Sequence, residues 1–223
     1  AGAVCQAKCN LKAGDEYMIS VAVIGGGASG MAFAVALKQK RPDIEVTVFE
    51  KNPKVLKKIL VTGNGRCNIL NFDAVAENYF EACEFLRPAV EKYAPKKTEA
   101  IFRDMGLLLM SEQEGRAYPI SQTAASVVCV LSSAAERAGV KVFTDTPVKS
   151  IKKSQGGFVI NNDKSFDFAV IACGGAAAPK QGTDGSSFEL FKALGIRVTE
   201  LSPALTGMCV KEMPFSLKAL RQY

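Results

Sequence analysis

Residues 19–30 read ISVAVIGGGASG, and this stretch decides the fold. Its apolar first half, residues 19–24, predicts a buried strand, and the glycines behind it have the spacing Gly25-x-Gly27-x-x-Gly30. Helix formers with an apolar face follow over residues 31–40, and the apolar run IEVTVF at 44–49 predicts a second strand. The order of strand, glycine turn, helix and strand is typical of a β-α-β unit of about 30 residues.

Each glycine of this pattern has a separate expected task. Gly25 permits a tight turn, Gly27 lets a diphosphate approach the backbone, and Gly30 lets the helix pack closely on the strand. Ala28 and Ser29 belong to this turn and are expected to contact the dinucleotide, and the N-terminus of the helix that follows offers free N–H groups and a positive dipole end to phosphate oxygens. The stretch therefore predicts a site for a dinucleotide.

Glu50 stands 20 residues after Gly30, at the carboxyl end of the second predicted strand. A carboxylate there can accept hydrogen bonds from ribose hydroxyls and would repel a 2′-phosphate, which favours FAD or NAD over NADP. The alternative is a glycine-rich turn with a chance surface acid. Lys51, together with lysines 54, 57 and 58, either attracts the anionic dinucleotide or forms a solvated face.

The rest of the chain fits an α/β, Rossmann-like fold with a parallel sheet and a β-meander. We expect helices at 74–93, at 98–105 with Thr98 as N-cap, and at 121–138, and strands at 140–143, 147–153, 157–160 and 166–172. The expected domains are a dinucleotide-binding domain at 18–195 with a helical insert at 72–120, and the start of an incomplete β-rich second domain at 196–223. Residues 1–17 are expected to be a leader, a tag or a displaced strand of that second domain.

Composition excludes several classes of site. The 223 residues include no histidine, which removes Ser-His-Asp, Cys-His and His-ligated metal chemistry. The seven cysteines form no C-x-x-C pair and predict reduced, mostly buried thiols of a cytoplasmic protein without a metal site. A net charge of +6 without basic runs, and the lack of a long apolar stretch, predict neither a nucleic-acid nor a membrane partner.

The stretch TGNGRCN at 62–68, with IGGGASG and FEKN before it, resembles the HI0933-type flavoproteins, FAD-dependent oxidoreductases related to the glutathione-reductase type of flavin fold. The resemblance continues through GRAYPIS at 115–121, VIACGG at 170–175 and TDG at 183–185. It covers residues 18 to about 210. It implies FAD as cofactor and a longer protein, whose further segments complete the flavin site.

The resemblance also implies that the loop at 63–68 lies along FAD. Its residues are Gly63, Asn64, Gly65, Arg66, Cys67 and Asn68. The chemistry agrees, because Asn-Gly turns expose backbone N–H groups and an arginine forms charge-assisted bonds to phosphate or flavin oxygens. A purely structural salt bridge is the alternative for Arg66, and simple packing is the alternative to a low-pKa thiol for Cys67.

Two further places carry over from the family. Val148 matches a position where related flavoproteins pair backbone groups with adenine. Cys173, Gly174 and Gly175 match a second flavin motif that usually reads A-T-G-G, with the cysteine here in place of threonine. The substitution keeps a small side chain and both glycines.

These observations predict a flavoprotein oxidoreductase in which a reduced nicotinamide, NADH or NADPH, gives hydride to FAD and the flavin reduces a small organic acceptor. No catalytic residue is assigned. The alternatives are a non-catalytic dinucleotide-binding fragment of a longer flavoenzyme, a flavin-dependent tRNA-modifying enzyme, and an NAD-only dehydrogenase.

Overall fold

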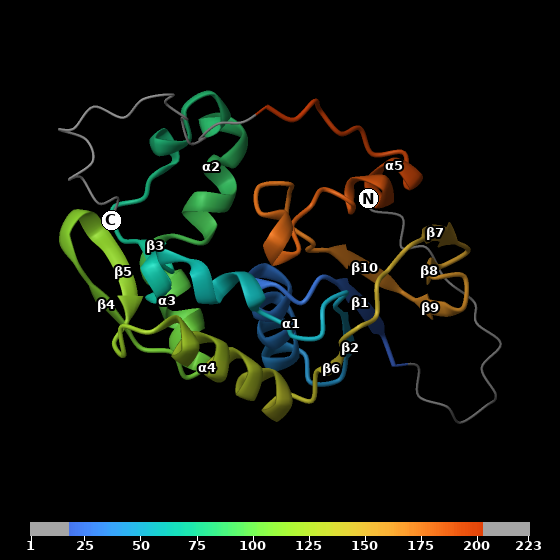
Figure 1. Ribbon diagram of the computed structural model, residues 1–223, viewed down its shortest axis with the longest axis horizontal. Coiled ribbons are helices and arrows are strands. Elements are labelled where there is room, and N and C mark those ends of the chain that lie inside the picture. The colour runs from blue at the N-terminus through green and yellow to red at the C-terminus, as the bar shows by residue number, and fades with distance from the viewer. Residues whose placement is uncertain (1–17, 203–223) are drawn as a thin grey trace, which may run out of the picture.

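The computed structural model describes residues 18–202, apart from the side chains of residues 80–83. Its centre is a parallel sheet in the order β10-β1-β2-β6 (Figure 1). The strands are β1 (Ser20–Ile24), β2 (Glu45–Phe49), β6 (Lys141–Phe143) and β10 (Phe168–Ile171). Helix α1 (Ala28–Lys40) connects β1 to β2, and this confirms the predicted β-α-β unit and the α/β Rossmann-like class.

The side chains of β1 alternate between two cores. Val21 and Val23 pack with α1 and with α4 (Ala124–Arg137), through residues such as Val35 and Leu131. Ala22 and Ile24 face the opposite side. Because both faces of a parallel sheet are covered, its strands are continuously apolar, as the run at 19–24 predicts.

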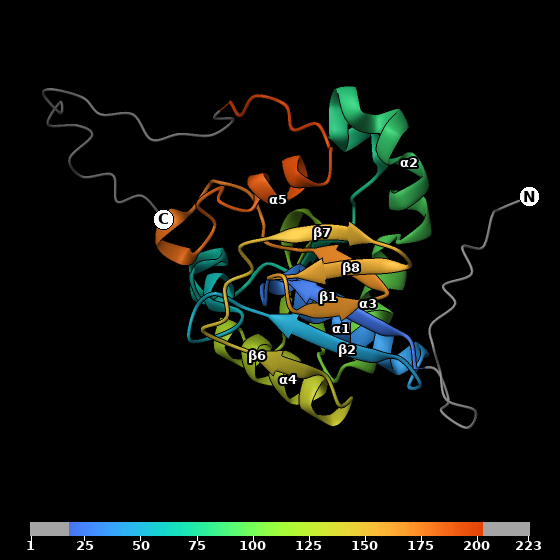
Figure 2. The ribbon, with the colours of Figure 1, turned by 90° about the vertical axis from the view of Figure 1, so that its right-hand side faces the viewer.

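The second face is covered by a three-stranded antiparallel sheet, β7 (Ile151–Ser154), β8 (Gly157–Ile160) and β9 (Lys164–Phe166). Figure 2 shows these strands lying over the parallel sheet, on the face opposite α1 and α4. Ile151 and Ile160 are fully buried against Ala22 and Ile24. The predicted β-meander is confirmed, although its first strand begins at Ile151 and residues 147–150 are irregular.

The single strand expected at 166–172 is instead divided between two sheets, and Asp167 is the reason. Its carboxylate accepts hydrogen bonds from the backbone N–H and the hydroxyl of Ser20, at 2.7 and 2.8 Å. Residues before Asp167 pair with β8, and residues after it pair with β1. One half-buried acid therefore stands where the chain passes from the meander to the edge of the parallel sheet.

Residues 57–119 form a separate flank beside α4. They include the 3₁₀ helices η1 (Lys57–Val61), η2 (Gly63–Gly65), η3 (Ala76–Ala82) and η4 (Gln113–Gly115), the helices α2 (Cys83–Lys92) and α3 (Pro95–Asp104), and an antiparallel sheet of β3 (Leu70–Asn71), β5 (Arg116–Pro119) and β4 (Leu109–Ser111). The helix expected over 74–93 is therefore divided into η3 and α2.

The prediction of Thr98 as an N-cap is wrong. Helix α3 starts three residues earlier, at Pro95, because a proline fits the first helical position and its missing N–H costs nothing there. The Thr98 hydroxyl lies inside the helix and donates to the carbonyl of Tyr93 at 2.7 Å.

The C-terminal part of the described chain contains η5 (Pro179–Gln181) and α5 (Phe188–Ala193), which packs over the meander through Leu190. The expected leader at 1–17 and residues 203–223 of the expected second domain lie outside the described residues. None of the helices between residues 18 and 202 has the length and apolar content needed to cross a bilayer.

Candidate dinucleotide site

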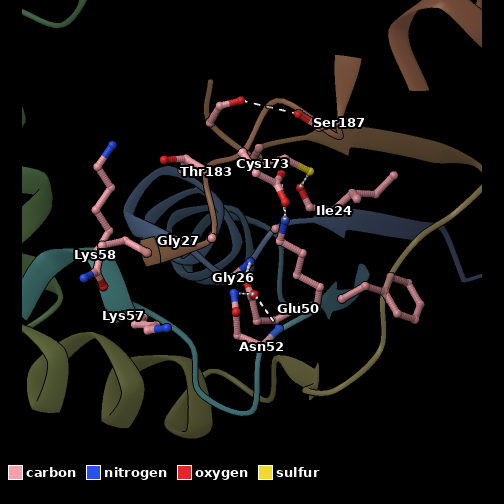
Figure 3. Close-up of a pocket in the computed structure, with 18 of the residues that line it drawn as sticks. Ile24, Gly26, Gly27, Glu50, Asn52, Lys57, Lys58, Cys173, Thr183 and Ser187 are labelled. Atoms are coloured by element: carbon pink, nitrogen blue, oxygen red, sulfur yellow. Dashed lines mark hydrogen bonds and ion pairs between the residues drawn. The ribbon is translucent and has the colours of Figure 1, made fainter. Parts of the chain in front are cut away.

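A cavity of about 610 Å³ opens where β1, β2 and β10 reach their carboxyl ends. Figure 3 shows the start of α1, the end of β2 and the loop after β10 meeting around it. Open α/β sheets bind ligands at this edge. Of the predicted residues, those that line the cavity are Gly25, Gly27, Ala28, Ser29, Glu50, Lys51, Val148, Cys173 and Gly174.

The N-terminus of α1 faces this cavity without a cap. Gly27 is the N-cap residue, and no side chain among the described residues caps the N–H groups at this end of the helix. The first turn also contains no acidic residue. The first backbone bond of the helix runs from the Met31 N–H to the Gly27 carbonyl, at 3.0 Å. The N–H groups of the first turn are therefore directed to the cavity and can receive an anion.

The three fingerprint glycines have three different surroundings. Gly25 has a φ of +109°, and a Cβ there would lie 2.6 Å from the Ala172 carbonyl oxygen. A Cβ on Gly30 would collide with the carbonyl oxygen of Gly25. A Cβ on Gly27 would meet no atom within 4 Å. Gly25 and Gly30 are thus required by the fold, whereas the space beside Gly27 is open to a ligand.

Glu50 follows β2 and is only 8% exposed. Its Oε2 accepts the Gly26 N–H at 2.8 Å, and its Oε1 accepts the backbone N–H and the side-chain amide of Asn52 at 2.8 and 2.6 Å. Figure 3 shows Gly26 and Asn52 converging on this carboxylate. The acid is therefore fixed at the wall of the cavity beside the glycine turn.

Lysines surround the cavity. Those that line it are Lys51, Lys54, Lys57, Lys58 and Lys149. The Lys51 ammonium is 2.9 Å from both carboxylate oxygens of Asp184, and the Ser186 hydroxyl donates to the same carboxylate at 2.6 Å. The bonds from Ser186 and then from Lys51 hold the pKa of Asp184 well below its usual range. This positive wall complements an anionic ligand.

Cys173 lines the cavity at the end of β10. Its thiol donates to the Ile24 carbonyl at 3.2 Å. Burial, followed by the negative charge of Glu50, raises the pKa of Cys173 to about 11. The side chain is therefore a neutral thiol at the cavity wall.

Arg66 is held away from the cavity by its own partners. Its guanidinium forms two bonds to Glu112, at 2.9 and 3.1 Å, and a third to the Gln122 side chain at 2.8 Å. It also lies 3.9 Å from the ring centre of Tyr118. Arg66 thus has protein partners for its guanidinium, and its expected contact with FAD stays a prediction.

Cys67 packs in the main core with Leu56 and Ile59. Burial raises the pKa of its thiol, which is the opposite of an activated nucleophile. Cys67 is therefore a packed thiol among the described residues, and its expected place along FAD stays a prediction. The predicted residues that the structure does not bring to the cavity wall are Gly30, Gly63, Asn64, Gly65, Arg66, Cys67, Asn68 and Gly175.

The cavity also has residues that the sequence did not single out. Gly26, Asn52, Thr183 and Ser187 line it, and Gly26 lies inside the fingerprint itself. Asn52 is the last residue of the FEKN stretch of the family resemblance, and its position two residues after the acid puts it within reach of a local side-chain bond. Thr183 belongs to the TDG stretch of the family resemblance, whereas no local pattern marks Ser187, which reaches the cavity only through the fold of the loop after β10.

Comparison with known proteins places the chain in a family. The family model described as the HI0933-like protein Rossmann domain matches residues 19–220. The chain is 37% identical over 206 residues to the 3-dehydro-bile acid delta(4,6)-reductase of Clostridium scindens, which covers 91% of this chain and 50% of that protein. It is 24% identical over 212 residues to the ribosomal RNA dihydrouridine synthase of Haemophilus influenzae, which covers 89% of this chain and 51% of that protein.

Among solved structures, THI4 of Thermovibrio ammonificans matches with a TM-score of 0.42 and 17% identity, over 64% of this chain and 45% of that one. The chain spans about half the length of the two curated relatives. The match to the family model extends over most of its residues and confirms the family expected from the motifs. The chain belongs to the family of HI0933-like proteins, as part of their Rossmann domain.

Proposed function

We propose that this chain is the FAD-binding part of a flavin-dependent oxidoreductase. The observation that carries the proposal is the pairing, at one cavity, of an uncapped helix N-terminus with a buried acid at the end of the neighbouring strand. The first feature suits a diphosphate and the second suits a ribose. The membership of the HI0933-like family supports the same ligand.

The described residues fit FAD in three parts. The N–H groups at Gly27, Ala28 and Ser29 would hold the diphosphate, and Glu50 would accept bonds from the ribose hydroxyls. Val148 lines the cavity beside Glu50's strand and would contact the adenine end. When bound, FAD supplies hydride and electron transfer, and the protein groups orient it.

For the reaction, we propose that NADH or NADPH reduces the flavin and that a small organic molecule is the acceptor, in the cytoplasm. The 37% identity to a bile acid reductase supports an organic acceptor. The 24% identity to a ribosomal RNA dihydrouridine synthase supports a second candidate, in which the acceptor is a base in RNA. Retention of RNA that is lost at raised salt would favour this second candidate.

A visible spectrum and an FAD titration test the proposal. The purified chain is expected to carry absorption bands of flavin, or to quench FAD fluorescence on titration with saturation at one equivalent. A chain that binds NAD but not FAD would contradict the proposal and favour the dehydrogenase. FAD binding without oxidation of NADH or NADPH in the presence of quinone acceptors would show that this chain is a binding module and that turnover needs further segments.

A further inference from the structure

We propose that Asn52 is a positioning residue for ribose recognition, which acts through Glu50. The inference rests on the proposed binding of FAD and adds to it a residue that neither the glycine pattern nor the family match assigns. Asn52 lines the cavity and follows Glu50 and Lys51 in the sequence. The geometry around the carboxylate gives it this task.

Three donors fix the Glu50 carboxylate. Asn52 supplies two of them, both to Oε1, through its backbone N–H at 2.8 Å and its side-chain amide at 2.6 Å. Gly26 supplies the third to Oε2, at 2.8 Å. Carboxylate oxygens offer about four acceptor sites in all, so one site, on Oε2, remains for a ribose hydroxyl. Loss of the Asn52 side chain would remove one of the two bonds that set the position of Oε1.

Asn52 is itself held in place. Its carbonyl accepts the Asp145 N–H at 3.1 Å, and the Glu50 carbonyl accepts the Thr146 N–H at 2.9 Å. On the other side, a Cβ on Gly182 would lie 2.7 Å from the Asn52 amide nitrogen, so the loop after β10 leaves this amide little room. The donor is therefore ordered by the fold before any ligand arrives.

The chemistry of the donor explains why an asparagine stands here. An amide donates a hydrogen bond without carrying charge, so it orients Glu50 and leaves its negative charge intact. The cation next to it, Lys51, is engaged by Asp184 at 2.9 Å. The carboxylate therefore keeps its preference for ribose hydroxyls and its repulsion of a 2′-phosphate.

A double-mutant cycle tests this inference, with the dissociation constant of FAD measured by calorimetry for wild type, Asn52→Ala, Glu50→Ala and the double variant. Asn52→Ala is expected to weaken binding about 10- to 20-fold, the lower end of the effect of losing a hydrogen bond to a charged group. In the Glu50→Ala background the same change is expected to alter binding by less than about 2-fold, because the group through which Asn52 acts is absent. Equal losses in both backgrounds, or no loss in the single variant, would overturn the inference.

Two further variants keep the result interpretable. Asn52→Asp brings a second carboxylate against Glu50 and is expected to weaken FAD binding more than Asn52→Ala does, with the extra loss absent when Glu50 is alanine. Asn78→Ala is the matched control, because the Asn78 side chain accepts the Val75 N–H outside the cavity. It is expected to leave FAD binding unchanged. A wild-type chain that fails to bind FAD would overturn the proposed function as well, whereas binding with an additive cycle overturns the role of Asn52 alone.

Discussion

Gly27 is the residue at which the fold and the ligand make different demands. Its φ of −77° suits any residue, and a Cβ added there meets no atom within 4 Å. Gly27→Val is therefore expected to leave the thermal unfolding midpoint of the ligand-free protein nearly unchanged. The same side chain would stand where we place the diphosphate, so FAD affinity should fall by roughly 100-fold or more. Fluorescence titration and a melting curve of the same sample measure both quantities.

Gly30→Ala is the matched comparison for Gly27→Val. Its methyl group would collide with the Gly25 carbonyl oxygen, and overpacking of this kind costs about 1–3 kcal/mol of unfolding free energy. We therefore expect Gly27→Val to be as stable as the wild type but unable to bind FAD tightly, and Gly30→Ala to be destabilised. FAD affinity that survives Gly27→Val would exclude the N-terminus of α1 as the diphosphate site.

Cys173 allows a prediction on pH. Because burial raises its pKa to about 11, the thiol stays protonated, and hence unreactive, throughout the neutral range. At pH 8, iodoacetamide is expected to label the exposed Cys129 well before Cys173, and labelling of Cys173 should rise only as the pH approaches 11. Peptide mapping by mass spectrometry resolves the two sites. Fast labelling of Cys173 at pH 8 would mean that its environment is more open than described.

At the scale of elements, an ion pair and a hydrogen bond connect the loop after β10 to the segment after β2. Lys51 pairs with Asp184, and the Lys57 ammonium donates to the Lys180 carbonyl at 3.1 Å. Both segments line the cavity, so these contacts join two parts of the wall that would surround a bound ligand. Lys51→Met is expected to raise the rate of FAD dissociation by about 2- to 5-fold, the small effect typical of a partly exposed ion pair. Stopped-flow fluorescence after dilution measures this rate.

Lys192→Met is the control for this change. Lys192 pairs with Glu189 at 2.8 Å within α5, and both side chains are exposed away from the cavity lining. Its removal alters the net charge by the same amount but leaves the two cavity segments joined. An equal acceleration in both variants would show that overall charge, and not the contact across the cavity, sets the rate of release.

How much of this arrangement the sequence predicts depends on the range of the interactions involved. The unit from β1 to β2 could be predicted because strand period, glycine spacing and the following acid are all local. The contacts of Arg66 could not be predicted, because its partner Glu112 lies far along the chain. The charge of an arginine alone does not indicate whether it will contact a ligand or a carboxylate of the protein. The break of the predicted strand at Asp167 has the same cause, because only the folded chain brings Ser20 beside it.

At the scale of the whole molecule, the cavity joins parts of the chain that are distant in sequence. Its wall takes residues from the start of α1, from the segment after β2, from the turn at Pro147 and Val148, and from the loop and helix after β10. A ligand in the cavity would therefore contact, at the same time, loops that leave the parallel sheet and the segment that leads into the antiparallel meander. Binding should stabilise the fold as a unit, and not only the loop that it touches.

This coupling gives a measurable shift in melting temperature. A ligand that binds only the native state, at about 100 times its dissociation constant, adds about 2.7 kcal/mol to the free energy of unfolding. For a chain of this size, each kcal/mol raises the midpoint by about 2–4 °C, so FAD is expected to raise it by about 5–10 °C. FMN, which lacks the adenosine ribose that Glu50 would bind, should give a smaller shift, and Gly27→Val should reduce the shift with FAD to about 2 °C or less. Equal shifts with FMN and FAD in the wild type would place the ligand elsewhere than between Glu50 and the start of α1, because only FAD offers groups to both.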